Sequence, residues 1–137
     1  MGEILLTRFI IVGISSGILF GILDALINAN PMAQRLYNVF KPISKTTINP
    51  VAGILIDLFY GFVMAWIFLL LYISLPGETG ILKGLSFGVI VWFFRVFMYS
   101  ATQWMIFNIP KTAIAYTLIT GFFEMLILGT FYGLTLN

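Results

Sequence analysis

Residues 88–104 have the sequence GVIVWFFRVFMYSATQW, a hydrophobic run that carries Arg95 near its middle. With the apolar residues on either side, the run is long enough for a helix that crosses a bilayer, because about 20 helical residues span roughly 30 Å of hydrocarbon. An arginine at the bilayer centre costs about 2.5–3.5 kcal/mol, and such charges pair with polar groups inside the protein. Arg95 therefore predicts a buried polar partner on a neighbouring helix.

The composition of the whole chain is that of a membrane protein. Of the 137 residues, 61% are hydrophobic and 9% are charged, whereas a soluble domain has about 45–50% apolar and about 25% charged residues. So few charged side chains would not cover the surface of a water-soluble protein of this length. We therefore expect the lipid bilayer to contact most of the surface. The net charge is only +2 and there is no basic tract, so no nucleic-acid partner is expected.

The chain has no cysteine and no histidine. Their absence removes disulfides, the usual ligands of zinc and haem, and the usual general base near neutral pH. The sequence also lacks the motifs of zinc metalloproteases, serine hydrolases and phosphate-binding loops. We therefore expect no metal, no cofactor and no catalytic residues.

Four hydrophobic segments are each long enough to cross a bilayer. Residues 76–80, PGETG, and 108–111, NIPK, are short turns, so the spans that they join are antiparallel neighbours. The fold class is therefore an all-α integral membrane protein, one domain over 1–137 built as an antiparallel bundle of four transmembrane helices. A signal peptide is the alternative for the first segment, although Asp24 is unusual in one. The predicted spans are residues 5–28, 51–75, 81–107 and 112–134.

Residues 32–41, between the first two spans, have a different pattern. Apolar side chains recur at helical spacing on one face and polar side chains occupy the other, which is typical of a short amphipathic helix lying in the membrane interface. A polar loop with scattered apolar residues is the alternative. The apolar face would hold Met32, Leu36, Val39 and Phe40, and the polar face Gln34, Arg35, Asn38 and Lys41.

Each of the other three spans carries one acid: Asp24, Asp57 and Glu124. With a rise of about 1.5 Å per residue, Arg95 and Glu124 both lie about 18–19 Å from the 108–111 turn, so we expect these two side chains to pair. Asp24 and Asp57 share a shallower level, nearer the 29–50 connection. If Arg95 satisfies one acid, two remain, and these are available to carry a proton or attract a cation.

The polar residues of the spans form one predicted cluster, for which two interpretations remain open. It is either a polar cavity with protonatable acids, open to the side of the 29–50 connection, or a closed network that fixes the register of the helices. The predicted intramembrane cluster consists of Asp24, Asn28, Asp57, Arg95, Gln103 and Glu124. The predicted cavity lining adds Trp92, Tyr99, Thr102 and Trp104.

Glycines recur at spacings that place them on one helix face, where small residues let helix backbones approach closely. Residues 17–23, GILFGIL, resemble residues 84–90, GLSFGVI, with G, F and G at the same positions 67 residues apart. The match predicts a parallel 2+2 internal repeat about an axis along the membrane normal, with coincidence as the alternative. The predicted helix-packing glycines are Gly13, Gly17, Gly21, Gly53, Gly61, Gly84, Gly88, Gly121 and Gly129.

Four spans place both termini on one side of the membrane. Basic residues near span ends favour the cytoplasmic side, and four of them flank the 29–50 and 108–111 segments, against two on the other side. We therefore expect these two loops to be cytoplasmic and both termini to lie outside. Short loops favour a prokaryotic plasma (inner) membrane. The basic residues beside the 29–50 and 108–111 segments are Arg35, Lys41, Lys45 and Lys111, and those on the opposite side are Arg8 and Lys83.

The short loops favour a non-catalytic membrane subunit, assembly factor or scaffold that binds partner membrane subunits or copies of itself. The alternative is a small oligomeric transporter or channel linked to protons or cations. In that case Asp24, Asp57 and Glu124 would carry the ion, and Arg95 would act as a counter-ion or gate. A lipid- or quinone-handling membrane enzyme is a third and weaker alternative, because acids alone would have to perform its catalysis.

Overall fold

The computed structural model of the protein describes residues 2–136, and over this range all regular elements are helical. The elements are α1 (Gly2–Asn28), α2 (Pro31–Leu36), η1 (Asn38–Ile43), α3 (Pro50–Leu71), η2 (Tyr72–Ser74), α4 (Gly80–Trp92), η3 (Phe93–Phe97), α5 (Met98–Ile106) and α6 (Lys111–Thr135). Because α4, η3 and α5 follow one another without a break, they form one long helix.

Four helices are long and apolar enough to cross a membrane, as predicted. Their mean hydropathy over 18 residues lies between 1.6 and 2.4. The predicted ends agree with the observed ends to within one or two residues, since proline, glycine and asparagine mark them clearly in the sequence. The spans are Leu5–Asn28, Pro50–Ser74, Gly80–Ile106 and Lys111–Thr135.

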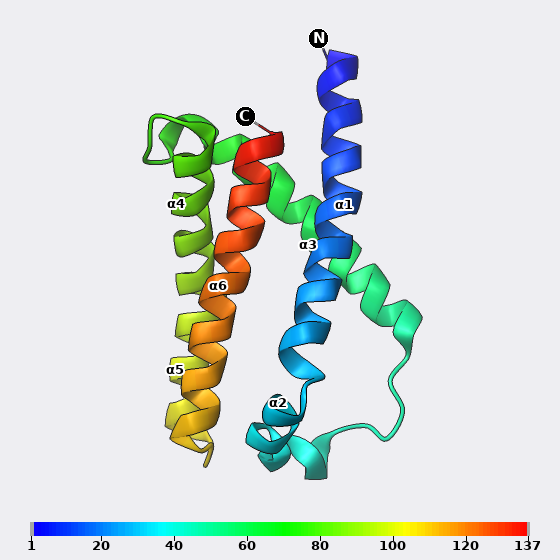
Figure 1. The fold of residues 1–137 in the computed structure, drawn as a ribbon, viewed down its shortest axis with the longest axis vertical. Helices are drawn as coiled ribbons and strands as arrows, with labels where there is room; N and C mark the ends of the chain where they lie inside the picture. The colour runs from blue at the N-terminus through cyan, green and yellow to red at the C-terminus, as the bar shows by residue number, and fades with distance from the viewer. Residues whose placement is uncertain (1, 137) are drawn as a thin grey trace.

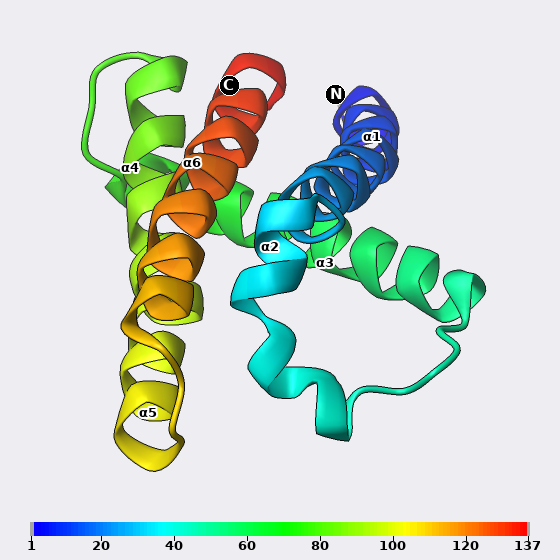
Figure 2. The ribbon, with the colours of Figure 1, turned by 60° about the horizontal axis from the view of Figure 1, so that its bottom comes forward.

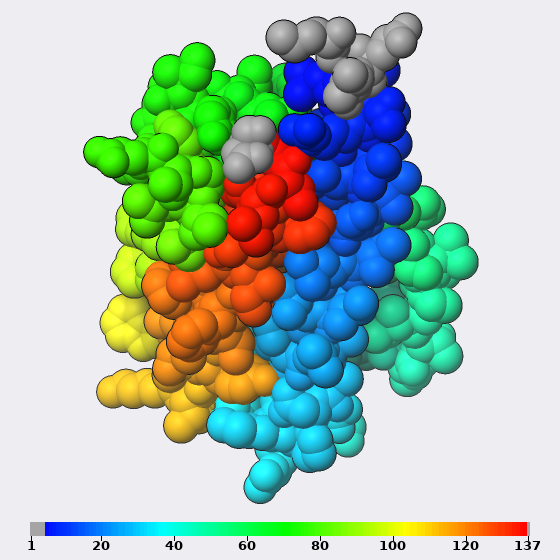
Figure 3. All heavy atoms as spheres, turned by 45° about the horizontal axis from the view of Figure 1, so that its top comes forward, coloured from blue at the N-terminus to red at the C-terminus, as the bar shows by residue number. Residues whose placement is uncertain are grey.

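The long helices form two closely packed pairs (Figure 1). Helix α4 with α5 lies beside α6 and runs in the opposite direction, while α3 passes behind α1 at a steep inclination. Helix α6 also meets α1, and in the space-filling view it lies between α4 and α1 (Figure 3). The first residues of α1 and the last of α6 lie at one end of the molecule, and the connections 29–50 and 107–110 lie at the other.

Helix starts follow from short polar side chains placed just before the hydrophobic runs. Asn49 accepts a hydrogen bond from the Val51 N–H at 3.0 Å, and Pro50 occupies the first helical position of α3. Thr79 accepts from the Leu82 N–H at 3.2 Å at the start of α4. Each cap satisfies a backbone N–H group that has no partner within the helix.

Glycines allow the paired helices to touch backbone to backbone. A Cβ atom added at Gly84 would lie 2.1 Å from the carbonyl oxygen of Gly129, across the α4–α6 contact. A Cβ atom added at Gly61 would lie 2.6 Å from the backbone nitrogen of Gly17, across the α1–α3 contact. Any larger residue at these positions would force the helices apart, so the glycines determine both crossings.

The other predicted packing glycines differ in what they meet. Gly13 faces the ring of Phe62, Gly88 faces the Met125 backbone, and Gly121 faces Val96. Gly53 differs from the other predicted packing glycines, because a Cβ atom there would meet no atom within 4 Å. Among residues 2–136, no neighbouring helix packs against it. It lies in the first turn of α3, beyond the point where α3 approaches α1.

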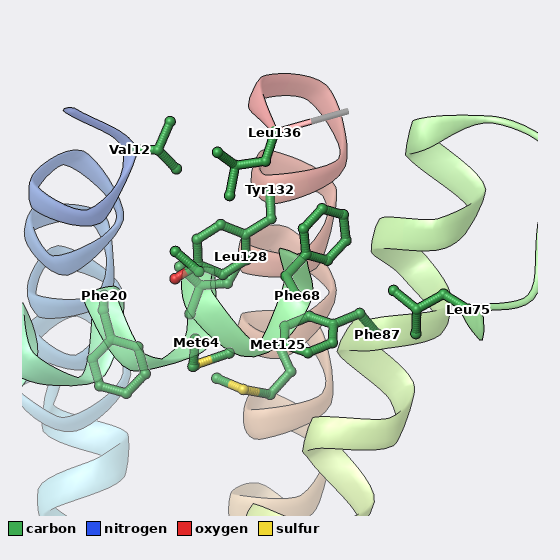
Figure 4. Close-up of a cluster of buried hydrophobic side chains, with 11 residues drawn as sticks. Val12, Phe20, Met64, Phe68, Leu75, Phe87, Met125, Leu128, Tyr132 and Leu136 are labelled. Atoms are coloured by element: carbon green, nitrogen blue, oxygen red, sulfur yellow. The ribbon is translucent and has the colours of Figure 1, made fainter. Parts of the chain in front are cut away.

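The buried core lies where α1, α3, α4 and α6 approach one another (Figure 4). Phe68 and Phe87 pack edge to face with ring centroids 5.4 Å apart, and both contact the ring of Tyr132. The hydroxyl of Tyr132 donates to the Gly61 carbonyl at 3.0 Å. This bond links α6 to α3, the two helices that belong to different pairs.

The segment predicted as an amphipathic helix over 32–41 is two short helices, α2 and η1 (Figure 2). The break falls at Tyr37. Pro42 lies inside η1 and has no N–H for a regular α-helical bond, which favours the tighter 3₁₀ form. Tyr37 packs against the Tyr116 ring with centroids 5.7 Å apart, so this segment docks on α6.

Candidate functional site: a polar cavity at Glu124

Arg95 lies in a π-helical turn, η3, at the middle of the long α4–α5 helix. The Met98 N–H donates to the Phe93 carbonyl, five residues back in the sequence, in place of the usual four. Such turns place an extra residue in the helical repeat and occur often at functional sites. The residues that follow are rotated relative to an unbroken helix, so the face of Arg95 is not the face predicted from a 3.6-residue period.

Arg95 and Glu124 form an ion pair, as their shared depth predicts. The Arg95 Nη1 atom lies 3.4 Å from the Glu124 Oε1 atom. This distance exceeds the roughly 2.7–2.9 Å of a close charge-assisted hydrogen bond. The Glu124 side chain is 3% exposed, and its Oε2 atom has no hydrogen-bond partner. Arg95 therefore satisfies only one of the two carboxylate oxygens.

Two aromatic rings support the guanidinium of Arg95. Its Cζ atom lies 4.8 Å from the Phe20 ring centroid and 4.9 Å from that of Tyr60. The two rings stack on each other at 5.0 Å. Cation–π contacts of this kind stabilise an arginine by about 0.5–2 kcal/mol, more when water is excluded. The charge of Arg95 is thus held by α1 and α3 as well as by α6.

A cavity of about 110 Å³ lies beside the ion pair. We call it the polar cavity. Its walls come from α1, the Tyr37 junction, η3 and α6, and most of its lining side chains are polar. The lining residues are Asp24, Ile27, Asn28, Tyr37, Arg95, Val96, Thr117, Thr120, Gly121 and Glu124.

The predicted cluster members do not all lie at the polar cavity. Asp24, Asn28, Arg95 and Glu124 line it. Asp57 lies outside the lining, and its carboxylate faces Gly21, where an added Cβ atom would be 3.0 Å from Oδ2.

The remaining predicted residues lie elsewhere on the α4–α5 helix, outside the lining of the polar cavity. Gln103 donates to the Tyr99 hydroxyl at 2.7 Å, one turn away, and neither lines the polar cavity. Thr102 donates to the Met98 carbonyl and is exposed, as expected if the π-turn rotates it away from Arg95. Trp92 donates to the Leu118 carbonyl, and Trp104 lines a separate groove.

Two residues of the site could not be found from the sequence. Phe20 is part of the repeated glycine–phenylalanine pattern, but nothing in that pattern indicates that its ring contacts Arg95. Tyr37 belongs to the connection between spans, and its hydroxyl lies 2.6 Å from the Thr117 hydroxyl. Burial raises the pKa of the Tyr37 phenol above its ordinary value, so the hydroxyl keeps its proton at neutral pH.

Two further grooves are mainly apolar. One of about 500 Å³ lies between α3 and α4 and ends at Arg95. The other, of about 320 Å³, lies between α5 and α6 and is floored by the small residues Ser100, Ala101 and Ala115. The polar cavity is therefore distinct in chemistry from both.

Among the side chains of residues 5–136, no three acids come close enough together to hold a metal ion. The polar cavity instead combines two carboxylates with one guanidinium, two threonines, an asparagine and a tyrosine. Comparison with protein-family models, with curated proteins and with solved structures gave no match.

Proposed function

We propose that the protein is a small membrane transporter linked to protons or cations, and that the polar cavity is its ion site. The observation that carries the proposal is the Oε2 atom of Glu124, which is buried without a hydrogen-bond partner at the wall of a polar cavity. A buried acceptor without a partner costs about 1–3 kcal/mol, and more when it is charged. A proton, a cation or water in the cavity would remove this cost.

The alternative of a closed structural network fits these contacts less well. A network that serves only to fix helix register would satisfy each of its members, because a partly satisfied buried network is less stable than an apolar one. Here the Arg95–Glu124 contact is long, at 3.4 Å, and one carboxylate oxygen is left over. The leftover oxygen and the adjacent space favour a working site.

In the membrane, we infer, the four helices stand as an antiparallel bundle with both termini outside and the 29–50 and 108–111 segments in the cytoplasm of a prokaryotic cell. The excess of basic residues beside those segments supports this orientation. Tyr37 belongs to the 29–50 connection and lines the polar cavity. Ions would then enter from the cytoplasmic side, past Tyr37 and Asn28, and reach Glu124.

The 2+2 repeat is part of the same proposal, and matched glycine contacts support it. Gly61 meets Gly17 in the first helix pair, and Gly129 meets Gly84 in the second. Gly17 and Gly84 are 67 residues apart, and Gly61 and Gly129 are 68 apart. A duplicated hairpin would explain why both pairs cross through equivalent glycines, and the polar cavity would lie near the axis between the halves.

Ion flux into proteoliposomes tests the proposed function. Purified protein is reconstituted in vesicles that enclose a dye sensitive to Na⁺, K⁺ or pH, and a gradient of the corresponding ion is applied. We expect flux with the native protein and at least a tenfold loss with Glu124→Gln and with Asp24→Asn, because each removes a charge from the polar cavity. Glu78→Gln is the matched control, since Glu78 is exposed in the turn before α4.

The outcome against the proposal is equally clear. Folded native protein that carries no ion under any of the three gradients would refute it. Flux that is unchanged in Glu124→Gln would show that the ion takes another route.

A second candidate, a non-catalytic subunit or scaffold, is favoured by the groove between α5 and α6. Small residues on its floor would let the helix of a partner subunit, or of a second copy, approach closely. Ala115→Phe would fill the groove, and we expect it to abolish a complex that Ile119→Phe, on the exposed face of α6, leaves intact. Native mass spectrometry in mild detergent measures this, and a native chain found only as a monomer would exclude the candidate.

A further inference from the structure

We propose that the polar cavity binds one monovalent alkali cation, Na⁺ or K⁺, through side-chain oxygens that include Oε2 of Glu124. Naming the ion rests on the proposed transport function, but binding is measured separately from transport. Four features support the assignment: the direction of the hydroxyl protons, the buried carboxylate, the net charge of the lining, and the size of the space.

The two threonine hydroxyl groups at the polar cavity donate their protons to backbone carbonyls of α6, not into the cavity. Thr117 donates to the Ala113 carbonyl at 3.0 Å, and Thr120 donates to the Tyr116 carbonyl at 2.7 Å. A threonine hydroxyl has one proton and two lone pairs, so both groups are left as acceptors. Since the Thr117 proton is committed, the Tyr37 phenol is the donor in their 2.6 Å contact.

The amide of Asn28 is oriented in the same way. Its Nδ2 atom donates one N–H to the backbone carbonyl of Asp24 at 2.9 Å, and its Oδ1 atom is an acceptor. Apart from Arg95 and the second N–H of Asn28, the polar side chains that line the cavity therefore offer mainly acceptor oxygens. An acceptor-rich space of this kind suits a cation and does not suit an anion.

Glu124 provides the second, independent observation. Its side chain is 3% exposed, it lines the polar cavity, and its Oε2 atom has no partner. Arg95 contacts the other oxygen, Oε1, and is held in place by Phe20 and Tyr60. Arg95 thereby orients the carboxylate, and Oε2 is left for a cation that it would share with the neighbouring carboxyl group of Asp24.

The charge of the lining selects a monovalent ion. The lining holds two carboxyl groups, Asp24 and Glu124, against one guanidinium, Arg95, so the acids outnumber the base by one, and one Na⁺ or K⁺ matches that excess. A divalent ion would leave a net positive charge in a low-dielectric interior, which is costly.

The size of the space agrees with a small ion. Water occupies about 30 Å³ per molecule in the liquid, and the polar cavity has a volume of about 110 Å³. It therefore accommodates one alkali cation with one or two waters that complete the coordination.

Thermal unfolding of the detergent-solubilised protein, followed by the fluorescence of its three tryptophans, tests binding. NaCl or KCl is titrated against choline chloride at constant ionic strength. A ligand that binds only the folded state raises Tm, and at 100 times its Kd we expect a rise of about 8 °C with at least one alkali ion. Choline, whose charge is shielded by three methyl groups, should give none.

Two variants identify the site. Glu124→Gln should abolish the ion-dependent rise in Tm. If that variant does not fold, Thr120→Val serves instead, and we expect an affinity for the ion about tenfold weaker because one ligand is lost. Thr135→Val is the matched control, since Thr135 makes the same type of bond to Phe131 on α6 but lies away from the polar cavity.

Failure of this inference is distinct from failure of the transport function. The same Tm in Na⁺, K⁺ and choline overturns the cation site, even if Glu124-dependent proton flux is present. An ion-dependent rise that Thr120→Val and Thr135→Val reduce equally also overturns it. An ion-dependent rise that is full in the native protein and in Thr135→Val, and that needs about tenfold more ion in Thr120→Val, supports the site, even in vesicles that show no flux.

Discussion

Gly129→Ala is the substitution that most directly probes how the helices are held together. A Cβ atom at this position would lie 2.1 Å from the Gly84 carbonyl oxygen and 3.0 Å from the Gly88 nitrogen. Since real Cβ atoms essentially never come closer than 3.0 Å to another heavy atom, α4 and α6 must separate by about 1 Å. The atoms that obstruct the methyl group are backbone atoms of a helix, so no side-chain rotation relieves the contact.

The energetic cost follows from that separation. A gap of about 0.5–1 Å removes a quarter to a half of the dispersion energy of the atom pairs across it, and overpacking a close-packed site costs about 1–3 kcal/mol. Alanine returns up to about 1 kcal/mol through its higher helix propensity. We therefore expect Gly129→Ala to destabilise the protein by about 2 kcal/mol.

Unfolding of the detergent-solubilised protein by added SDS measures this change, with the native protein alongside. Gly53→Ala is the matched control, because the same methyl group at Gly53 meets no atom within 4 Å. Its stability should equal or slightly exceed that of the native protein. If Gly129→Ala is as stable as Gly53→Ala, α4 and α6 do not cross through their glycines, and the explanation of the fold is wrong.

Two other substitutions test single contacts. Arg95→Met leaves the buried carboxylate of Glu124 without its ion-pair partner and should destabilise the protein by about 3 kcal/mol in the same SDS assay; an unchanged midpoint would mean that the pair contributes no stability. Tyr132→Phe removes the bond to the Gly61 carbonyl and should cost about 1 kcal/mol, again by SDS unfolding, with no change in the far-UV circular dichroism. A loss close to zero would indicate that water replaces the hydroxyl.

The spans could be predicted from the sequence because local signals define them. Length and hydropathy identify each hydrophobic run, and residues such as Asn49, Pro50 and Thr79 mark where helices begin. The Arg95–Glu124 contact was also predictable, since the 108–111 turn makes their helices neighbours and the rise per residue puts both side chains at one depth.

The rest of the site depends on long-range contacts that periodicity does not encode. The π-turn at Arg95 rotates the residues that follow it, so Thr102 and Gln103 do not face the polar cavity as a regular helix predicts. Tyr37 reaches the cavity because the 29–50 connection folds back on α6, and no sequence pattern reports such docking.

The open space beside Gly53 could not be predicted either, for a similar reason. A glycine pattern identifies a face that can pack closely, but it does not show where two inclined helices diverge. Because α3 passes α1 at a steep inclination, the contact is confined to the region around Gly61, and Gly53 lies beyond it (Figure 1).

The central claim is that a water-accessible polar cavity lies inside a membrane-spanning helix bundle, and neighbouring single-cysteine variants test it directly. The chain has no cysteine, so Thr120→Cys and Ile119→Cys each introduce one thiol. Thr120 lines the polar cavity, whereas the Ile119 side chain is 58% exposed on the outer face of α6. In membrane vesicles, a charged water-soluble thiol reagent should label Thr120→Cys from the side of the 29–50 connection and should leave Ile119→Cys, which faces lipid, unlabelled. Labelling of Ile119→Cys without labelling of Thr120→Cys would contradict the claim, because it would mean that water reaches the outer face and that the interior is dry.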